Sequence, residues 1–228
     1  TRPTRGGADP SRCSSAESKS YLISNFCPNV NAKPSEPAIG AAGAEIVLNN
    51  AYHLMLRPGT DLIRSFGGSH GFMRWDRPIL TDSGGYQAFS MSDINAIDDD
   101  GVSFRSFIDG ARVHLGPESS MEVQNAIGAD IIMAFDDCPP SPNARHGAGS
   151  PRAKLPTPAD WIRRMDEAHD RTVRWLERCR KAHARSQDQA LFGIVQGGTD
   201  LDRRDRSREA ICGIDLPGYA IGGVAGGG

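Results

Sequence analysis

Five short runs of consecutive apolar residues recur along the chain, and each ends in polar residues or glycine. The runs cover residues 45–48, 78–81, 131–135, 191–195 and 219–221. Continuous apolar runs of this length, without the alternation of a half-exposed strand, are typical of parallel strands that are buried on both faces. The pattern therefore predicts five parallel strands.

Helical patterns lie between several of these runs. We expect helices near residues 61–65, 119–127, 157–183 and 202–211. The second should end at Gly128, because glycine suits the left-handed conformation that closes helices. The third begins with Thr157 as N-cap, Pro158 in the first turn and Asp160 completing a variant of the capping box. Its buried face is expected to consist of Trp161, Met165, Ala168, Thr172, Leu176, Cys179 and His183.

Other segments interrupt this alternation. Residues 102–108 and 111–115 flank Asp109-Gly110, a dipeptide that favours a two-residue turn, so an inserted β-hairpin is expected. Residues 139–158 predict a long exposed loop, with a Pro/Gly/Arg-rich insertion near residues 144–158. Residues 1–38 predict a poorly ordered segment before a domain that covers residues 39–228.

Alternating strands and helices indicate an α/β fold with parallel strands. A (β/α)₈ barrel of the TIM type and a doubly wound sheet both fit this alternation. No G-x-G-x-x-G motif follows the first strand, which weakens the dinucleotide-binding form of the doubly wound sheet. Polar residues or glycines follow all five strands, and only a barrel brings all strand ends to one mouth. We therefore favour the barrel.

Composition is that of a globular protein with one domain. The chain has 228 residues, 26 Lys plus Arg against 28 Asp plus Glu, and a hydrophobic fraction of 38%. This balance excludes a fully disordered chain and a general polycation, but it is compatible with a local nucleic-acid surface. No apolar run is long enough to cross a membrane. Scattered cysteines without a CxxC pair, and no secretory leader, favour a reducing cytoplasm.

The segment with the most candidate catalytic and binding groups covers residues 81–87, with the sequence TDSGGYQ. Asp82 leaves the second strand at a Gly-Gly turn, where backbone N–H groups can approach a ligand closely, and Tyr86 can stack on a planar ring. By itself this element fits a helix N-cap. However, Asp136 and Asp137 end the third strand, and carboxylates from two strand ends at one mouth are hard to explain as capping alone.

Amide and glycine residues close the next two strands. Gln196 follows the fourth strand, and Gly223 lies just after the fifth. A carboxylate accepts hydrogen bonds from ring N–H or amino groups, whereas an amide or a backbone N–H donates to a carbonyl. Together these groups match the edge of a purine such as guanine, although a small polar metabolite fits as well. His53 is interpreted as a hydrogen-bonded packing residue rather than a base. Cys138 stands beside Asp137 and could ligate a metal, but no second Cys or His lies nearby, so it too is interpreted as a packing residue.

Charge is distributed unevenly along the chain. Residues 145–185 contain eleven Lys or Arg against five acidic residues, and residues 93–137 contain ten acidic residues and two arginines. A basic loop and helix beside an acidic pocket suit a phosphate backbone that presents a base. A solvated helix face with a basic insertion explains the same pattern equally well.

These motifs closely resemble those of the bacterial tRNA-guanine transglycosylases, also called queuine tRNA-ribosyltransferases. The matching stretches are residues 49–59, 75–87, 104–109, 119–139, 191–198 and 219–225. The resemblance runs from about residue 34 to residue 228, except for the insertion near residues 144–158. It implies a (β/α)₈ barrel with a zinc-binding subdomain, and an incomplete barrel here, of which this chain holds about strands two to six.

The resemblance implies an enzyme that exchanges guanine at the tRNA anticodon wobble position for a 7-deazaguanine base of the preQ1 or queuine type. Carried over residue by residue, it assigns a proton-transfer role to Asp82. The implied base pocket consists of Asp82, Ser83, Gly84, Gly85, Tyr86, Asp136, Gln196 and Gly223. The implied macromolecular partner is tRNA, and a homo-oligomer is left open.

The resemblance is incomplete at both ends of the chain. The family's second aspartate, which attacks the ribose, and its Cys-x-Cys-x-x-Cys zinc motif with a His have no counterpart in these residues. We therefore expect no metal ligand and no cofactor in this chain, and little or no exchange activity by the chain alone. Two alternatives stay open: a non-catalytic accessory module that binds a base or tRNA, and a fragment of a disrupted gene. An archaeosine-type enzyme that acts elsewhere on tRNA is an alternative at the level of the substrate.

Overall fold

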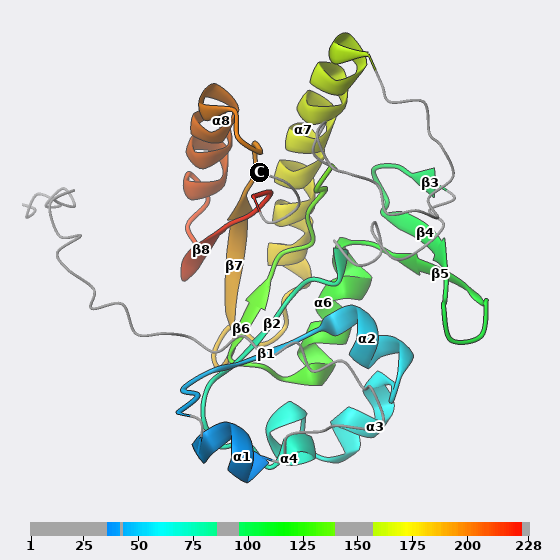
Figure 1. Ribbon diagram of the computed structural model, residues 1–228, viewed down its shortest axis with the longest axis vertical. Coiled ribbons are helices and arrows are strands. Elements are labelled where there is room, and N and C mark those ends of the chain that lie inside the picture. Colours follow the sequence, from blue (N-terminus) through cyan, green and yellow to red (C-terminus); the bar gives the residue numbers. More distant parts are fainter. Residues whose placement is uncertain (1–35, 42, 86–95, 140–156, 225–228) are drawn as a thin grey trace, which may run out of the picture.

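The computed structural model describes residues 36–41, 43–85, 96–139 and 157–224, whose arrangement is shown in Figure 1. The main sheet has five parallel strands: β1 (Val47–Asn49), β2 (Ile79–Thr81), β6 (Ile131–Met133), β7 (Ala190–Val195) and β8 (Gly218–Ile221). The five predicted strands are thus confirmed. They pair in chain order, β1-β2-β6-β7-β8, without a reversal, so their carboxyl ends share one edge of the sheet.

The two faces of this sheet are buried to different extents. Val47, Ile79 and Ile132 lie on one face and are fully buried. The neighbouring Leu48 and Leu80 lie on the other face and are only half-buried. The prediction of burial on both faces therefore holds for one face of the described sheet, the face that packs against the helices.

The helices of the described residues are α1 (Glu36–Ala41), α2 (Ala51–Leu56), α3 (Thr60–Ser65), α4 (Ser69–Met73), α6 (Pro117–Ile127), α7 (Pro158–Ala182) and α8 (Leu201–Cys212). The predicted helices are confirmed as α3, α6, α7 and α8. The sequence did not predict α1, α2 and α4, which span five or six residues and are too short to show a full helical period; α3, also of six residues, was the short helix that was expected. α1 begins inside the segment of residues 1–38 for which no regular structure was expected.

α7 is the longest of these helices and begins as its sequence predicts. The Thr157 hydroxyl accepts the backbone N–H of Asp160 at 3.2 Å, and the Thr157 N–H donates to the Asp160 carboxylate at 3.3 Å. Its buried face contains Met165, Ala168, Thr172, Leu176 and Cys179 as predicted, and also Trp175. Trp161 and His183, predicted on the same face, are only half-buried. α6 also ends as predicted, at Gly128 with φ of 71°.

A smaller antiparallel sheet consists of β3 (Ala96–Ile97), β4 (Val102–Arg105) and β5 (Arg112–Leu115). The last paired residues of β4 and β5 are Arg105 and Arg112, so the two-residue turn predicted at Asp109-Gly110 is wrong. The connection is wider because the Gly110 N–H donates to the Ser106 carbonyl at 2.8 Å and starts a loop rather than a tight turn.

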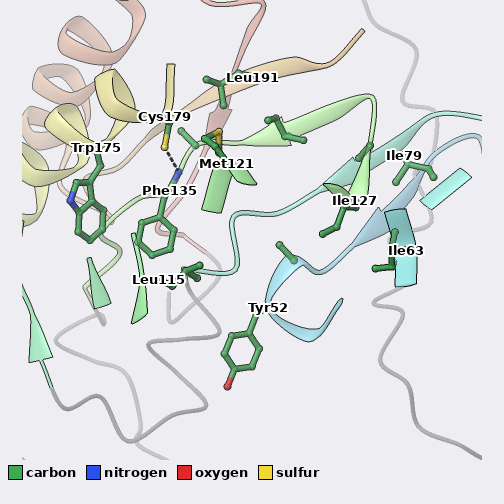
Figure 2. Packing of buried hydrophobic residues seen from close by; sticks show 14 of the residues in the cluster. Tyr52, Ile63, Ile79, Leu115, Met121, Ile127, Phe135, Trp175, Cys179 and Leu191 are labelled. Atoms are coloured by element: carbon green, nitrogen blue, oxygen red, sulfur yellow. Dashed lines mark hydrogen bonds between the residues drawn. The ribbon is translucent and has the colours of Figure 1, made fainter. Parts of the chain in front are cut away.

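One hydrophobic core joins both sheets to the helices. Figure 2 shows its buried side chains, among them Tyr52, Ile63, Ile79, Leu115, Met121, Ile127, Phe135, Trp175, Cys179 and Leu191. The Phe135 ring lies 4.9 Å from the Trp175 ring between centroids, and the Phe135 N–H donates to the Cys179 sulfur at 3.3 Å. The Trp175 indole also donates to the Asp99 carbonyl at 2.7 Å. α7 thereby holds both the end of β6 and the smaller sheet.

Three predictions fall on residues outside the described part of the chain. These are most of the segment over residues 1–38, most of the loop over residues 139–158 with its insertion, and the position of Tyr86. Among the helices that are described, none is long and apolar enough to cross a membrane.

Candidate functional site

Asp82 is the first residue after β2, at the carboxyl edge of the main sheet. One of its carboxylate oxygens accepts the backbone N–H groups of Ala51 at 2.9 Å and Gly84 at 3.1 Å. The other accepts the side-chain amide of Asn50 at 2.8 Å. Donors from the end of β1 and from the turn after β2 thus fix both oxygens.

Asn50 is a site residue that the sequence analysis did not single out. Its side-chain oxygen accepts the backbone N–H of His53 at 3.0 Å and caps α2, while its amide nitrogen donates to Asp82. One side chain therefore starts a helix and orients a carboxylate. The only local signal was an Asn-Asn pair at the end of the first apolar run, before a helix too short to recognise.

Burial changes the acidity of Asp82. Loss of solvent raises the pKa of its carboxyl group from 3.8 to about 6, although the hydrogen bonds from Ala51 and Gly84 act in the opposite direction. A carboxyl group whose pKa lies near the operating pH can both accept and release a proton. The geometry therefore equips Asp82 for proton transfer near neutral pH.

Ser83, Asp136 and Gln196 come together from the ends of β2, β6 and β7. The Ser83 hydroxyl donates to one Asp136 carboxylate oxygen at 3.4 Å, and the Gln196 side-chain amide donates to the other. Gly85 lies against the same group, since a Cβ there would be 3.2 Å from the Asp136 carbonyl oxygen. Polar residues that follow three of the predicted strands are therefore neighbours in space.

Asp136 is buried, with 6% of its surface exposed, and this burial raises the pKa of its carboxyl group to about 6. The hydrogen bond from Gln196 lowers the pKa, the negative charge of Asp137 raises it, and the hydrogen bond from Ser83 lowers it. When charged, a buried carboxylate in this position is a strong acceptor for the N–H groups of a ligand.

Gly84 and Gly223 occupy positions where a side chain would collide. Gly84 has φ of 75°, and a Cβ there would lie 3.0 Å from the Tyr52 backbone nitrogen. Gly223 has φ of 69°, and its Cβ would overlap the side-chain oxygen of Gln196. At both positions, therefore, steric contact with neighbouring atoms explains why the residue is glycine.

Asp137 does not share these contacts with Asp136. Its fully buried carboxylate binds two arginines of α7 instead, Arg164 at 2.5 and 2.8 Å and Arg171 at 2.5 Å. The carboxylate pair that the sequence placed at the end of the third strand therefore divides into two units. One faces the neighbouring strand ends and the other forms an ion-pair cluster with α7.

The remaining candidates are His53 and Cys138. His53 is buried against the rings of Tyr52 and Phe107, and burial lowers its pKa. Burial raises the pKa of the Cys138 thiol to about 12, so the thiol stays neutral. Among the residues that the structure describes, no group of three or more His, Cys, Asp or Glu side chains is placed to hold a metal ion. That part of the chain therefore does not fit the zinc site that the resemblance implies for the family.

Most arginines of α7 and α8 are paired with acidic side chains, and Arg204 donates instead to the carbonyl oxygens of Gly198 and Gly222. Ion pairs of this kind involve Arg163, Arg164, Arg171, Arg174, Arg178, Arg180, Arg203, Arg206 and Arg208. Within the described residues, the positive charge of α7 and α8 is therefore largely neutralised by acidic neighbours. This favours the interpretation of α7 as a solvated, internally paired helix over that of a phosphate-binding surface.

Comparison with known proteins gives a consistent result. A family model described as Queuine tRNA-ribosyltransferase matches residues 29–228. A curated protein of that name from Halalkalibacterium halodurans is 53% identical over 183 residues, which cover 80% of this chain and 44% of the relative. Another from Gloeobacter violaceus is 52% identical over 187 residues, which cover 82% of this chain and 45% of the relative. The chain thus spans under half the length of these relatives, and it belongs to the queuine tRNA-ribosyltransferase family.

Proposed function

We propose that this chain carries the base-binding site of a tRNA-guanine transglycosylase, which exchanges guanine at the anticodon wobble position of tRNA for a 7-deazaguanine base of the preQ1 or queuine type. The observation that carries the proposal is the convergence of Ser83, Asp136 and Gln196 beside Asp82 at one edge of the sheet. Family membership supplies the substrate class whose chemistry these groups match.

The surroundings of Asp136 suit the hydrogen-bonding edge of guanine. The charged carboxylate can accept the ring N–H and the exocyclic amino group of guanine together, since two parallel donors fit its two oxygens. Gln196, whose amide donates to Asp136, can turn an N–H toward the base carbonyl. Guanine and 7-deazaguanine differ at ring position 7 and share this edge, so one pocket can bind the leaving base and the entering base.

We assign the proton-transfer role to Asp82. A base that leaves ribose as a neutral molecule must gain a proton, and the base that replaces it must lose one. With a pKa of about 6, Asp82 can donate the first proton and accept the second. Its neighbour Ser83 binds Asp136, which places the proton-transfer group beside the proposed base pocket. Gly84, Gly85 and Gly223 keep the space around these groups free, and Tyr86, outside the described residues, completes the proposed pocket.

A partial (β/α)₈ barrel is the scaffold that we propose. The strands pair in chain order, as in a barrel, without the reversal of a doubly wound sheet. Helices cover one face, while Leu48 and Leu80 on the other face stay half-buried. In this arrangement the five strands are about strands two to six of the barrel, residues 39–228 form the barrel domain, and β4 with β5 is an inserted hairpin.

A base-exchange assay tests the function. The purified chain is incubated with tRNA that carries radiolabelled guanine and with unlabelled 7-deazaguanine base, and release of label is followed. Asp82→Asn should abolish any release while guanine still binds in calorimetry, and Asp136→Asn should abolish binding itself. Asp109→Asn, on the exposed hairpin loop, is the matched control and should change neither.

The outcomes separate the proposed enzyme from its alternatives. Guanine binding that requires Asp136 but leads to no exchange would favour the accessory module that binds a base or tRNA. A chain that binds neither guanine nor 7-deazaguanine would contradict both functions.

A further inference from the structure

The two neighbouring carboxylates at the end of β6 have opposite surroundings. Among the described residues, the hydrogen-bond partners of the Asp136 carboxylate are the neutral Ser83 and Gln196, whereas both oxygens of Asp137 contact the arginines of α7. The side chain of Asp137 is fully buried, and those of Arg164 and Arg171 are 28% and 13% exposed. The negative charge of Asp137, next to Asp136, is thus compensated by two arginines of α7 that are not part of the proposed base pocket.

α7 also holds the backbone at this point. The Asp137 N–H donates to the Thr172 hydroxyl at 3.1 Å, and that hydroxyl lies 3.4 Å from the Asp137 carbonyl oxygen. With the side chain and the backbone of Asp137 both fixed to one helix, the backbone of the preceding residue, Asp136, is held as well, which restricts the direction of its side chain.

Few other charges act on Asp136. Cys138 follows Asp137 on the chain and Cys179 lies on α7, and burial raises the pKa of both thiols to about 12, so both are neutral. Asp82 is at the end of the neighbouring strand and is occupied by its own hydrogen-bond donors. Among the described residues, Asp137 is the charged neighbour that raises the pKa of Asp136, and Arg164 and Arg171 pair with that neighbour.

We propose that Arg164 and Arg171 are positioning residues of the base site: by pairing with Asp137 they fix the direction of the Asp136 carboxylate and keep it charged at neutral pH. A buried carboxylate beside an uncompensated like charge would instead hold its proton. This inference rests on the proposed function for the identity of the ligand, but the state of Asp136 can be measured without one.

The test is the titration of Asp136 in the ligand-free chain, followed by ¹³C NMR of carboxyl-labelled aspartate and assigned by the signal that Asp136→Asn removes. Asp137→Asn removes the like charge and should lower the midpoint by about one pH unit, whereas Arg164→Met removes a compensating charge and should raise it by about half a pH unit. Arg180→Met is the matched control on α7, because Arg180 pairs with Glu177 at the surface, and it should leave the midpoint unchanged.

Shifts of opposite sign cannot come from loosened packing alone, which would move both variants in one direction. A midpoint that does not move, or that moves the same way in both variants, overturns the proposal. If Asp137→Asn fails to fold, the sign for Arg164→Met still decides, because loosened packing would hydrate the carboxyl group and lower its midpoint rather than raise it. Guanine binding at neutral pH is measured in parallel. If the wild-type chain does not bind guanine, the proposed function is contradicted. Midpoint shifts of opposite sign in the two variants would still support the positioning role.

Discussion

At the scale of single residues, Asp82 and Asp136 differ from surface acids because the fold removes them from water. Burial raises the pKa of each to about 6, and hydrogen bonds from Ala51, Gly84 and Gln196 offset only part of that effect. Keeping these groups charged therefore lowers the stability of the fold, since a buried charge is stable only to the extent that its partners compensate for lost hydration. Perturbed acids of this kind are typical of functional sites.

Asp136→Asn should increase the free energy of unfolding at pH values above the pKa of the Asp136 carboxyl group. Folding raises that pKa from 3.8 to about 6, so the folded state binds the extra proton between these values and loses stability as pH rises through about 6. The neutral variant avoids this loss. We expect a gain of about 1–2 kcal/mol at about pH 8 that disappears at about pH 4.5, measured by urea unfolding. An equal effect at both pH values would show that Asp136 is not shifted upward.

Gly223→Ala should weaken base binding with little loss of stability. The added methyl group would displace the amide of Gln196, and losing one hydrogen bond to the ligand weakens binding roughly tenfold. Gly110→Ala is the matched control, because its φ of 73° is close to the 69° of Gly223 and nothing lies within 4 Å of its Cβ. Both variants should lose about 1 kcal/mol in unfolding, and only Gly223→Ala should lose guanine affinity in calorimetry. Equal affinities would contradict the steric argument.

At the scale of elements, α7 connects parts of the chain that lie far apart in sequence. It binds Asp137 at the end of β6, packs Trp175 on Phe135, and holds the smaller sheet through Asp99. The long elements were predictable, because eleven or more residues show a helical period and a cap such as Thr157 is a local signal. Of the helices of five or six residues, α3 was expected but α1, α2 and α4 were not, since such short helices depend on tertiary packing more than on their own pattern.

Thr157→Ala should destabilise α7 at its start. The variant removes the acceptor for the Asp160 N–H and the hydroxyl partner of the Asp160 carboxylate, and the loss of such a cap costs about 1 kcal/mol. Thr157→Ser keeps the hydroxyl and should retain most of the stability. Urea unfolding of the two variants checks this, and identical midpoints would mean that the capping box does not stabilise the helix.

At the scale of the whole molecule, the two edges of the main sheet have separate roles. The carboxyl edge carries the acids and the amide of the site, while the amino edge carries a structural cluster. There the Asp130 carboxylate accepts the Ile79 N–H at 2.7 Å and lies 3.0 Å from Nε2 of His70. In a barrel this division is general, because the loops after the strands hold the chemistry and the opposite end supports the fold.

Asp130→Ala should lower stability and leave base binding unchanged. The variant leaves the N–H of Ile79, a fully buried residue, without its acceptor, which costs about 1–3 kcal/mol. Thermal unfolding should show the loss, while calorimetry with guanine should give the wild-type affinity at a temperature where the variant is folded. A weaker affinity would show that the two edges are coupled.

The sequence by itself determined the α/β alternation, the five strands and the polar residues at their ends. These features depend on the spacing of apolar positions, on turn residues and on helix caps, each of which involves only a few neighbouring positions. Only the tertiary structure decided which of those residues meet. Asn50 reaches Asp82 across 32 positions, Gln196 reaches Asp136 across 60, and Asp137 binds Arg164 across 27. The start of α2 supplies the first pair, the pairing of β6 with β7 brings the second together, and the packing of α7 forms the third. The burial that results raises the pKa of Asp82 and Asp136.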